Sequence, residues 1–470
     1  MPTWAADESE PISPAQADLL AARLRGRLLR PGAGGYDEAR KTHNGAVQHR
    51  PPLIAQPLDA QDAATAVTFA REQGLDLSVR CGGHGVAGRA VAGTLVMDLS
   101  RIGHVRVDPQ RRLCRAGGGA LWGAVDAANE AYGLATPGGR ITHTGIGGLT
   151  LGGGQGWLSS LHGLCVDNLT SAELVTADGN VIKVSDDSDP DLMWALRGGG
   201  GNFGAVTELT YRLHELGDVL AGGVSYPMEQ AAELVQHYRE FMQNAPAEVS
   251  GSVYLPGPPA EPLVPAHLHS RPVAVLLLIY TGPDLAKGER ILRPMREAGQ
   301  PLADRVQPMP YTQLQSILDP ANLSGRRTYT STAFLADLPD PMARRFLEHA
   351  SNPPSRHSYC AFTRLGAAAN RVPWHATAFS HREAVWMCYM DAMWDDPADD
   401  EANRDWIHAA MDVIDGYAGT GRYLNISANL DTDAVRRSYG EPTYERLTRI
   451  KTAWDPDNLF RHNANILPRR

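Results

Sequence analysis

The stretch Arg80-Cys81-Gly82-Gly83-His84-Gly85 lies between two short apolar runs, residues 75–79 and 93–100. Apolar runs of this length with glycine at their borders predict two buried strands. Three glycines in the connecting turn let backbone N–H groups converge, which favours an anion such as a pyrophosphate. A histidine in such a turn suggests a covalent tether for the bound cofactor. The alternative, a tight turn that merely exposes a histidine, stays open on this stretch alone.

Composition narrows the class of protein. A chain of 470 residues is long enough for two or three domains, and 43% hydrophobic with 21% charged residues is ordinary for a globular protein. The net charge of −9 and the lack of a basic patch argue against nucleic-acid binding. Because no apolar run reaches the length of a membrane span and the acidic N-terminus has no signal-like segment, we expect no membrane partner and a cytoplasmic location.

The five cysteines are scattered and odd in number. No CxxC pair is present, so neither a disulfide framework nor a structural zinc site is indicated. We therefore expect no metal and mostly buried free thiols.

The N-terminal half alternates helical and strand patterns. Residues 14–29 predict an amphipathic helix. Residues 51–79 predict strand, helix and strand, with Asp59 as the helix N-cap and Gly74 at its end. Hairpins are predicted across Asp108-Pro109 and across Asp178-Gly179.

Glycine is concentrated again at residues 138–157 and 198–204. In the first of these, isoleucine, leucine and tryptophan are interleaved with the glycines, unlike a flexible polar linker. Such a sequence indicates packed backbone that closely approaches a flat or charged group.

After residue 215 the glycine density falls. Helical segments at 228–245 and 284–299 alternate with strand-like runs, which lie at 251–257, 272–282, 358–366 and 384–394. This order predicts an antiparallel sheet with helices on one face, and the chain ends in one helix and a proline-containing tail. Six aromatic residues of this region could line a cleft or belong to a core, and the sequence leaves both alternatives open: Tyr280, Tyr329, Tyr359, Trp374, Trp386 and Trp394.

Five motifs occur together: RCGGHG (80–85), GIGGLTLGGGQGW (145–157), GLCVDNL (163–169), DLMWALRGGGGNFGAVT (191–207) and KTAWDPDNLFRHNANILP (451–468). In this order they resemble the FAD-linked oxidases of the berberine bridge enzyme type, which have a vanillyl-alcohol-oxidase-like, PCMH-type FAD domain. The resemblance covers the chain from about residue 45 to its end.

That resemblance implies an α+β fold with a two-part FAD domain and an inserted substrate domain. The expected divisions are an N-terminal helix and loop (1–45), the PCMH-type FAD domain (46–216), the substrate domain (217–432) and a C-terminal segment returning to the FAD domain (433–470).

The same resemblance implies the cofactor site. His84 corresponds to the histidine bonded through its ring to the C8-methyl group of the flavin. The other cofactor-binding positions that it implies are Arg80, Cys81, Gly82, Gly83, Gly85, Thr144, Gly145, Gly147, Gly148, Leu149, Gly152, Gly153, Gly154, Asp167, Asn168, Val206, Asn425 and Asn465. Backbone donors free of Cβ atoms suit the two phosphates and the planar ring of FAD.

Two departures from the family pattern matter. Many members add a second flavin bond from a cysteine, but that position is Ile141 here, so we predict a single bond through His84. Cys165, beyond the glycine loop, is expected to be a buried thiol. Where members carry YxNY with a suspected tyrosine base, this chain has Tyr423-Leu424-Asn425-Ile426, and Ile426 cannot accept a proton.

The catalytic candidates are therefore Tyr423, or Tyr389 and Asp391, which share one strand face by period-two alternation. A core position for Tyr389 stays open. In the family, the residue at Thr144 lies over the flavin, and its small size favours an oxidase.

The resemblance implies an FAD-dependent oxidase that takes hydride from a C–H or CH–OH group of a bulky, ring-containing small molecule, a sugar or secondary metabolite. Oxygen would be the acceptor and hydrogen peroxide the product. The alternatives are a dehydrogenase with a quinone or protein acceptor and, given Ile426, an inactive flavin-binding protein. A different class is a flavoprotein that only relays electrons, such as the FAD subunits of molybdenum hydroxylases. These subunits should lack the inserted domain and the C-terminal motif, so the sequence argues against this class.

Overall fold

The computed structural model describes residues 12–419, 421–428 and 431–469. Its first sheet has the order β1 (Arg27–Leu29), β2 (Leu53–Gln56), β4 (Leu95–Asp98), β3 (Leu77–Arg80), with β2 and β3 both parallel to β4. Helix α3 (Ala60–Gln73) connects β2 to β3. The Asp59 side chain accepts a hydrogen bond from the backbone N–H of Asp62, and Gly74, at φ 64°, ends the helix. The predicted strand, helix and strand, with both caps, are confirmed.

The helix predicted over residues 14–29 is too long. α1 spans Pro14–Arg23, and the following residues form β1, which pairs antiparallel with β2. A Cβ atom on Gly26 would lie 2.1 Å from the carbonyl oxygen of Gln56. This close approach of two backbones favours the strand pairing over a longer helix.

The second sheet is antiparallel, and two of its strands, β8 (Leu169–Val175) and β10 (Ala205–Arg212), are the next strands along the chain after the second and third glycine-rich regions. Its order is β5 (Val105–Asp108), β6 (Leu113–Gly117), β10, β8, β9 (Val181–Ser185). The pairs β5–β6 and β8–β9 are the two predicted hairpins, which are confirmed. Helices α4 (Trp122–Glu130) and α7 (Pro190–Leu196) supply buried residues to the core of this region.

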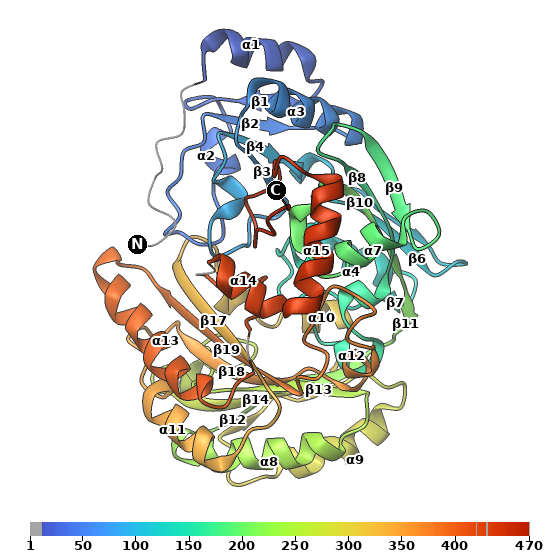
Figure 1. Ribbon diagram of the computed structural model, residues 1–470. Helices are drawn as coiled ribbons and strands as arrows, with labels where there is room; N and C mark the ends of the chain where they lie inside the picture. Colours follow the sequence, from blue (N-terminus) through green and yellow to red (C-terminus); the bar gives the residue numbers. More distant parts are fainter. Residues whose placement is uncertain (1–11, 420, 429–430, 470) are drawn as a thin grey trace.

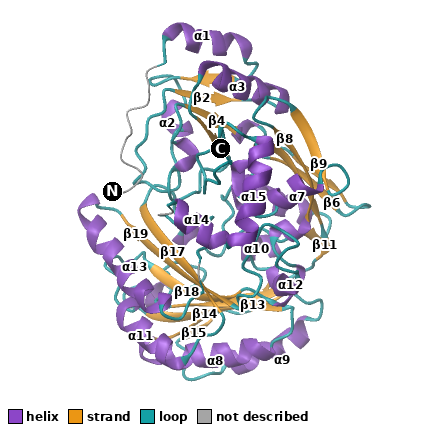
Figure 2. Cartoon of the chain, viewed as in Figure 1, coloured by secondary structure: helices purple, strands orange, loops and turns teal. Residues whose placement is uncertain are grey.

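The third sheet forms the lower half of the molecule (Figure 1). Its order is β15 (Ala303–Asp304), β12 (Val219–Pro227), β14 (Val273–Tyr280), β13 (Val249–Tyr254), β18 (Tyr359–Arg364), β19 (Trp386–Trp394), β17 (Arg327–Leu335), and β16 (Gln307–Met309) also pairs with β12. One face carries α8 (Ala231–Asn244), α9 (Leu285–Arg296), α11 (Asp340–Ala350) and α13 (Asp400–Asp415) (Figure 2). The predicted antiparallel sheet covered by helices on one face is confirmed, although β12 and β17 were not singled out.

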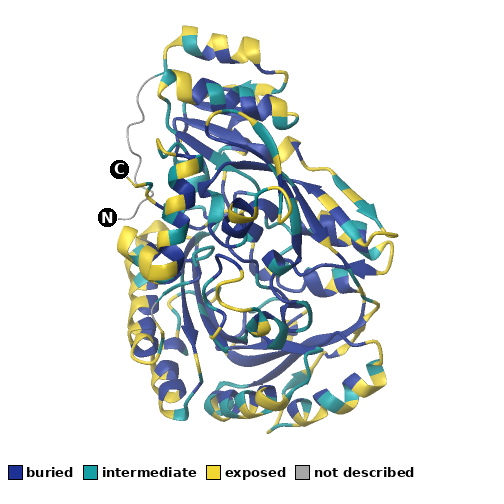
Figure 3. Cartoon of the chain, turned by 45° about the vertical axis from the view of Figure 1, so that its right-hand side comes forward, coloured by how far each residue is buried: buried dark blue, intermediate teal, exposed yellow. Residues whose placement is uncertain are grey.

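Strand β19 shows how the two faces differ. Trp386, Cys388 and Met390 pack with the helices, whereas Tyr389 and Met393 contact the core on the opposite face. Figure 3 shows the sheet largely buried and the outer surfaces of these helices exposed. Polar residues at odd positions of β19 are thereby directed away from the helices and toward the glycine-rich half of the chain.

The C-terminal helix is divided in two. α14 (Thr432–Tyr439) and α15 (Glu441–Trp454) meet at Gly440, which has φ 73°. The Lys451 ammonium group is fully buried and donates to Asn202 O at 2.8 Å, Phe460 O at 3.1 Å and Asp455 Oδ2 at 2.6 Å. These bonds fasten the end of the chain to the third glycine loop. Among the described residues, no helix is both long and apolar enough to cross a membrane.

We expect Lys451→Met to lower the free energy of unfolding by about 3–5 kcal/mol, because it leaves Asp455 charged, buried and without its cation. Arg449→Met, an exposed position on the same helix, should change it by less than about 0.5 kcal/mol. Urea unfolding of both variants checks this prediction, and equal losses would contradict it.

Candidate active site

A cavity of about 360 Å³ lies between the glycine-rich loops and the helix-free face of the third sheet. Its volume falls in the range of small-molecule sites. All three glycine loops contribute to its wall, with residues 81–85, 144–152 and 200–204 represented. The opposite wall includes Tyr389 and Asp391 of β19 and the segment 423–426.

The first two glycine loops touch backbone to backbone. A Cβ atom on Gly82 would lie 2.4 Å from the Gly145 nitrogen, and one on Gly145 would lie 2.2 Å from the Gly82 nitrogen. By contrast, Cβ atoms on Gly85, Gly148 and Gly201 would meet no protein atom within 4 Å, although all three line the cavity. The first pair holds the loops together, and the others leave open space for a large planar or phosphate-bearing ligand.

His84 is half-buried at the wall of this cavity, and its buried Nε2 has no hydrogen-bond partner among the described residues. Its ring stacks on that of His43 at 4.0 Å between centroids, with His143 at 5.1 Å. Burial lowers the pKa of His84 well below its usual value, and burial together with the neighbouring His143 lowers the pKa of His43 to about 4. The His84 ring is therefore neutral at physiological pH, with a free nitrogen lone pair. One nitrogen from each of the three rings lies within 4.8 Å of the others.

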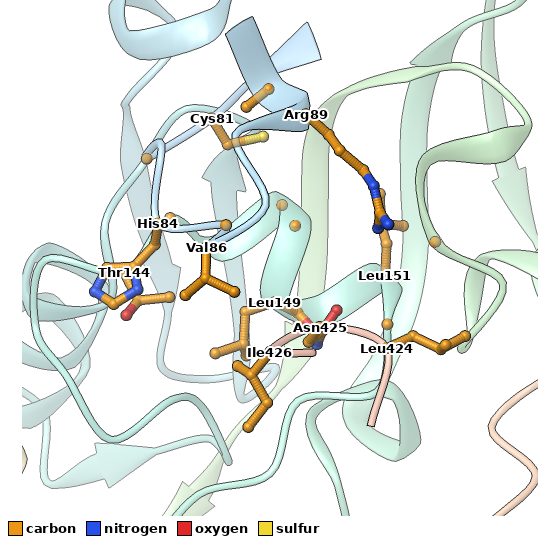
Figure 4. Close-up of a pocket in the computed structure, with 18 of the residues that line it drawn as sticks. Cys81, His84, Val86, Arg89, Thr144, Leu149, Leu151, Leu424, Asn425 and Ile426 are labelled. Carbon is orange, nitrogen blue, oxygen red and sulfur yellow. The ribbon is translucent and has the colours of Figure 1, made fainter. Parts of the chain in front are cut away.

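Figure 4 shows His84 beside Thr144, while Arg89 extends along the other side of the cavity toward Leu151. Most positions expected to bind cofactor line this cavity: Cys81, Gly82, Gly83, His84, Gly85, Thr144, Gly145, Gly147, Gly148, Leu149, Gly152, Val206 and Asn425. The three catalytic candidates, Tyr423, Tyr389 and Asp391, line it as well. The expected residues outside the lining are Arg80, Gly153, Gly154, Asp167, Asn168 and Asn465.

The charged and amide residues outside the lining hold loops in place. Arg80 pairs with Asp98 at 3.0 Å. Asp167 receives two hydrogen bonds from Arg382, at 2.6 and 2.8 Å. Asn168 donates to the carbonyl oxygens of residues 162 and 164. These contacts support the glycine loops, and none of the three residues lines the cavity.

Gly153 and Gly154, which lie outside the lining, are packed so closely that a side chain at either position would clash with a neighbour. A Cβ atom on Gly153 would lie 2.6 Å from the Phe379 ring, and one on Gly154 would lie 2.3 Å from Cys165 Cβ. Asn465 has a buried Oδ1 with no partner among the described residues, and its neighbours Asn463 and Ala464 line the cavity.

The aromatic residues of the third sheet lie on different faces, so some belong to the core and others line the cavity. Trp386, Trp394, Tyr280 and Tyr329 belong to the core beneath the helices, and Trp374 is exposed. Tyr359 lines the cavity. Sequence reasoning missed Arg89, Arg140, Gln155, Tyr254 and Asn322 in the lining. For Tyr254, the strand alternation was a usable signal, because its position on β13 faces the same side as Tyr359 on β18.

Asp391 is the acidic group of the sheet-side wall and is 2% exposed. Its Oδ2 accepts a hydrogen bond from the Tyr389 hydroxyl at 2.8 Å, and its Oδ1 accepts one from Thr330 Oγ1 at 3.1 Å. Burial raises the pKa of Asp391 to about 6. A carboxyl group with this pKa, in contact with a phenol at a cavity wall, is suited to accept and return a proton.

Tyr423 has a different environment. Its hydroxyl oxygen accepts hydrogen bonds from the backbone N–H of Gly154 at 2.9 Å and from Asn425 Nδ2 at 3.0 Å. Asn425 Nδ2 also donates to Leu149 O at 2.9 Å. Tyr423 and Asn425 thus join the tail segment to the second glycine loop, which gives Tyr423 a positioning contact in addition to its place in the cavity.

Comparison with known proteins agrees with this geometry. Residues 51–185 match the family model of the FAD binding domain, and residues 422–467 match the model described as berberine and berberine like. An FAD-linked oxidoreductase of Dictyostelium discoideum is 30% identical over 95% of both chains. The chain belongs to the berberine-like FAD-linked oxidoreductases, a class of flavin enzymes with the α+β fold described above.

Individual relatives give further detail. The (R)-6-hydroxynicotine oxidase of Paenarthrobacter nicotinovorans is 29% identical over 95% of this chain and 97% of its own. The crystal structure of 6-hydroxy-D-nicotine oxidase from Arthrobacter nicotinovorans superposes with a TM-score of 0.82, covering 95% of this chain and 98% of that one. Glucooligosaccharide oxidase from Acremonium strictum, 22% identical, shares the fold with a TM-score of 0.84 over 97% and 99% of the two chains, and its FAD is described as 6-S-cysteinyl, 8α-N1-histidyl.

The open space at Gly148 and the close contact at Gly145 predict different defects. Gly145→Ala should destabilise the apoprotein, since the new methyl group would overlap the Gly82 backbone. Gly148→Ala, in helix α5 (Ile146–Leu151), should leave apoprotein stability unchanged or slightly higher but reduce flavin content. Thermal unfolding of apoprotein and the flavin-to-protein absorbance ratio distinguish the two. A stable, flavin-loaded Gly145→Ala protein would contradict this account of the loop contact.

Proposed function

We propose that this protein is an oxidase that removes hydride from a C–H or CH–OH group of a bulky, ring-containing small molecule and passes the electrons to O₂, yielding H₂O₂. The observation that carries the proposal is that a neutral His84 and the Asp391–Tyr389 pair face each other across one cavity. The names of the nicotine-oxidising and oligosaccharide-oxidising relatives support oxidation of a ring-containing substrate.

The cofactor is FAD, held through His84 alone. The cavity provides open backbone at Gly85 and Gly148 and an unpartnered ring nitrogen on His84, which together fit a covalently tethered flavin. Ile141 lines the cavity and has no nucleophilic atom. Cys165 lies outside the lining, contacts Thr150 Oγ1 at 3.3 Å, and has its pKa raised to about 12 by burial, so it is a poor nucleophile.

FAD bound in this cavity supplies hydride acceptance and electron transfer to oxygen. The side chains of the protein accept the proton that leaves the substrate. Asp391 is mostly ionised at neutral pH, and the Tyr389 hydroxyl already donates to it, so a proton leaving a substrate hydroxyl can pass to Tyr389 as the Tyr389 proton passes to Asp391. This pair supplies the base that Ile426 cannot. Thr144 lies beside His84, and its small side chain favours access of oxygen more than a bulkier residue would.

The tether is tested by acid precipitation and peptide mass mapping. In the unmodified protein, the flavin should remain with the pellet and its mass should be found on the His84 peptide. His84→Ala should release all flavin to the supernatant, and Cys165→Ala should retain it. A flavin mass on the Cys165 peptide would overturn the single bond.

The oxidase chemistry is tested with a panel of sugars, cyclic alcohols and phenols. Under anaerobic conditions, a substrate should bleach the flavin absorbance, and admission of air should restore it with release of H₂O₂. Bleaching without reoxidation by air would favour a dehydrogenase, and the absence of bleaching by any compound would favour an inactive flavin-binding protein.

With a substrate in hand, kcat/KM should rise as pH increases through about 6, because Asp391 accepts protons only when ionised. Asp391→Asn should lower kcat by about 10²- to 10⁴-fold and remove that limb of the pH profile. Tyr389→Phe removes the group that takes the proton directly, so it should lower kcat to a similar extent with the flavin content unchanged. An Asp391→Asn enzyme with a normal pH profile would exclude Asp391 as the base.

A further inference from the structure

Arg140 presents a guanidinium group to the wall of the cavity. Its Nη1 donates to Thr363 Oγ1 at 3.2 Å, its Nη2 donates to Gln155 Oε1, and its Nε is buried without a hydrogen-bond partner among the described residues. The group lies 4.7 Å from the centroid of the buried Trp157 ring. Every polar partner of this cation in the described chain is therefore neutral.

Three other arginines in partly buried surroundings meet carboxylates, whereas Arg364, like Arg140, has no ion pair among the described residues. Arg80 pairs with Asp98, Arg382 pairs with Asp167, and Arg327 pairs with Asp400. For Arg140, no carboxylate oxygen of the described residues lies within the 4.0 Å that defines an ion pair. A partly buried cation without a counter-ion is costly to maintain, which points to a charge partner that comes from outside the chain.

We propose that Arg140 binds an anionic group of the substrate, and that the substrate is a ring-containing carboxylic acid. This inference rests on the proposed oxidase function of the same cavity. A carboxylate in the cavity can pair with the Arg140 guanidinium, whose planar set of N–H donors supplies a two-pronged geometry that lysine does not.

The position of Arg140 assigns it to the substrate rather than to the cofactor. Although it belongs to the glycine-rich half of the chain, its side chain contacts Thr363, which lies on β18 of the third sheet. The face of that sheet on which Tyr359 and Tyr389 lie forms the wall opposite the glycine loops. The guanidinium thus lies away from Gly85 and Gly148, beside which the cavity is open, and toward the sheet-side wall that carries Asp391.

The same strand gives the scale of the substrate. Thr363 is four residues from Tyr359 on β18, and Tyr359 is paired in register with Asp391. The positions of Thr363 and Asp391 are therefore separated by roughly 13 Å along the strand direction. Tyr254 is paired with Ala361, midway between them, and its ring lies 5.7 Å from that of Tyr359. An acid with its carboxylate at Arg140 and its reacting carbon near Asp391 would place a ring over these tyrosines.

The test uses flavin-loaded protein and three probes: benzoate, phenylacetate and 3-phenylpropionate, each compared with its primary amide. Binding is followed by the change in the flavin absorption spectrum, so no turnover is required. We expect at least one carboxylate to bind about ten- to hundredfold more tightly than its amide, because it gains charged hydrogen bonds.

Two variants separate the roles of charge and fold. Arg140→Gln should abolish the preference for carboxylate while leaving amide affinity within about twofold. Gln155→Glu should abolish it too, because it gives Arg140 a carboxylate of its own. Arg140→Lys should retain part of the preference, since the charge remains and the planar fork is lost. Covalent flavin content and melting temperature provide the check on folding.

The inference is overturned if no carboxylate binds more tightly than its amide, or if the preference survives in Arg140→Gln. It is also overturned if Arg140→Gln loses its flavin, since Arg140 would then serve the cofactor. These outcomes differ from failure of the oxidase proposal, in which the flavin is not bleached by any compound although the probes still bind according to charge.

Discussion

The contact between Gly82 and Gly145 is the constraint on which the rest of the site depends. Two loops that are 63 residues apart cross with no side chain between them, and a single methyl group at either position would enter the other backbone. This crossing fixes His84 beside Thr144 and determines where the open backbone of Gly85 and Gly148 lies. The cavity is thus shaped first by the absence of side chains and only then by the groups that line it.

A second constraint is the alternation of β19. Its even-numbered residues complete a core of tryptophan, cysteine and methionine under four helices, and that packing fixes the strand register. Tyr389 and Asp391 are then held on the opposite face with little freedom to move. The apolar packing also contributes to the chemistry, because the burial that it produces raises the pKa of Asp391 toward neutrality.

Local patterns were sufficient to predict much of this. The caps Asp59 and Gly74, both hairpins, and the shared face of Tyr389 and Asp391 follow from short-range rules of turn chemistry and periodicity. The glycine loops and His84 were recognised by their motif spacing. Motif spacing says less about the Asp167-Asn168 pair, because the same residues form contacts that hold the neighbouring loop in place.

The remaining features depend on contacts between distant segments. Arg382 reaches Asp167 across 215 residues, and Tyr423 reaches Gly154 across 269. The environment of Arg140 is set by Thr363, 223 residues away, and by the lack of an ion-pairing carboxylate among the described residues. Sequence periodicity gives information on local structure and not on contacts between distant segments. The contacts of Asp167 and the environment of Arg140 could therefore not be predicted from the sequence.

The return of the chain end also has a temporal consequence. Phe460, Asn463 and Ala464 line the cavity, and the buried Lys451 fastens this segment to Asn202. During synthesis, the third glycine loop leaves the ribosome about 250 residues before Phe460 and its neighbours, which complete the cavity wall. The cavity therefore has its full wall only after this segment has been synthesised, and a nascent chain that stalls before it lacks part of the surface that surrounds the cofactor.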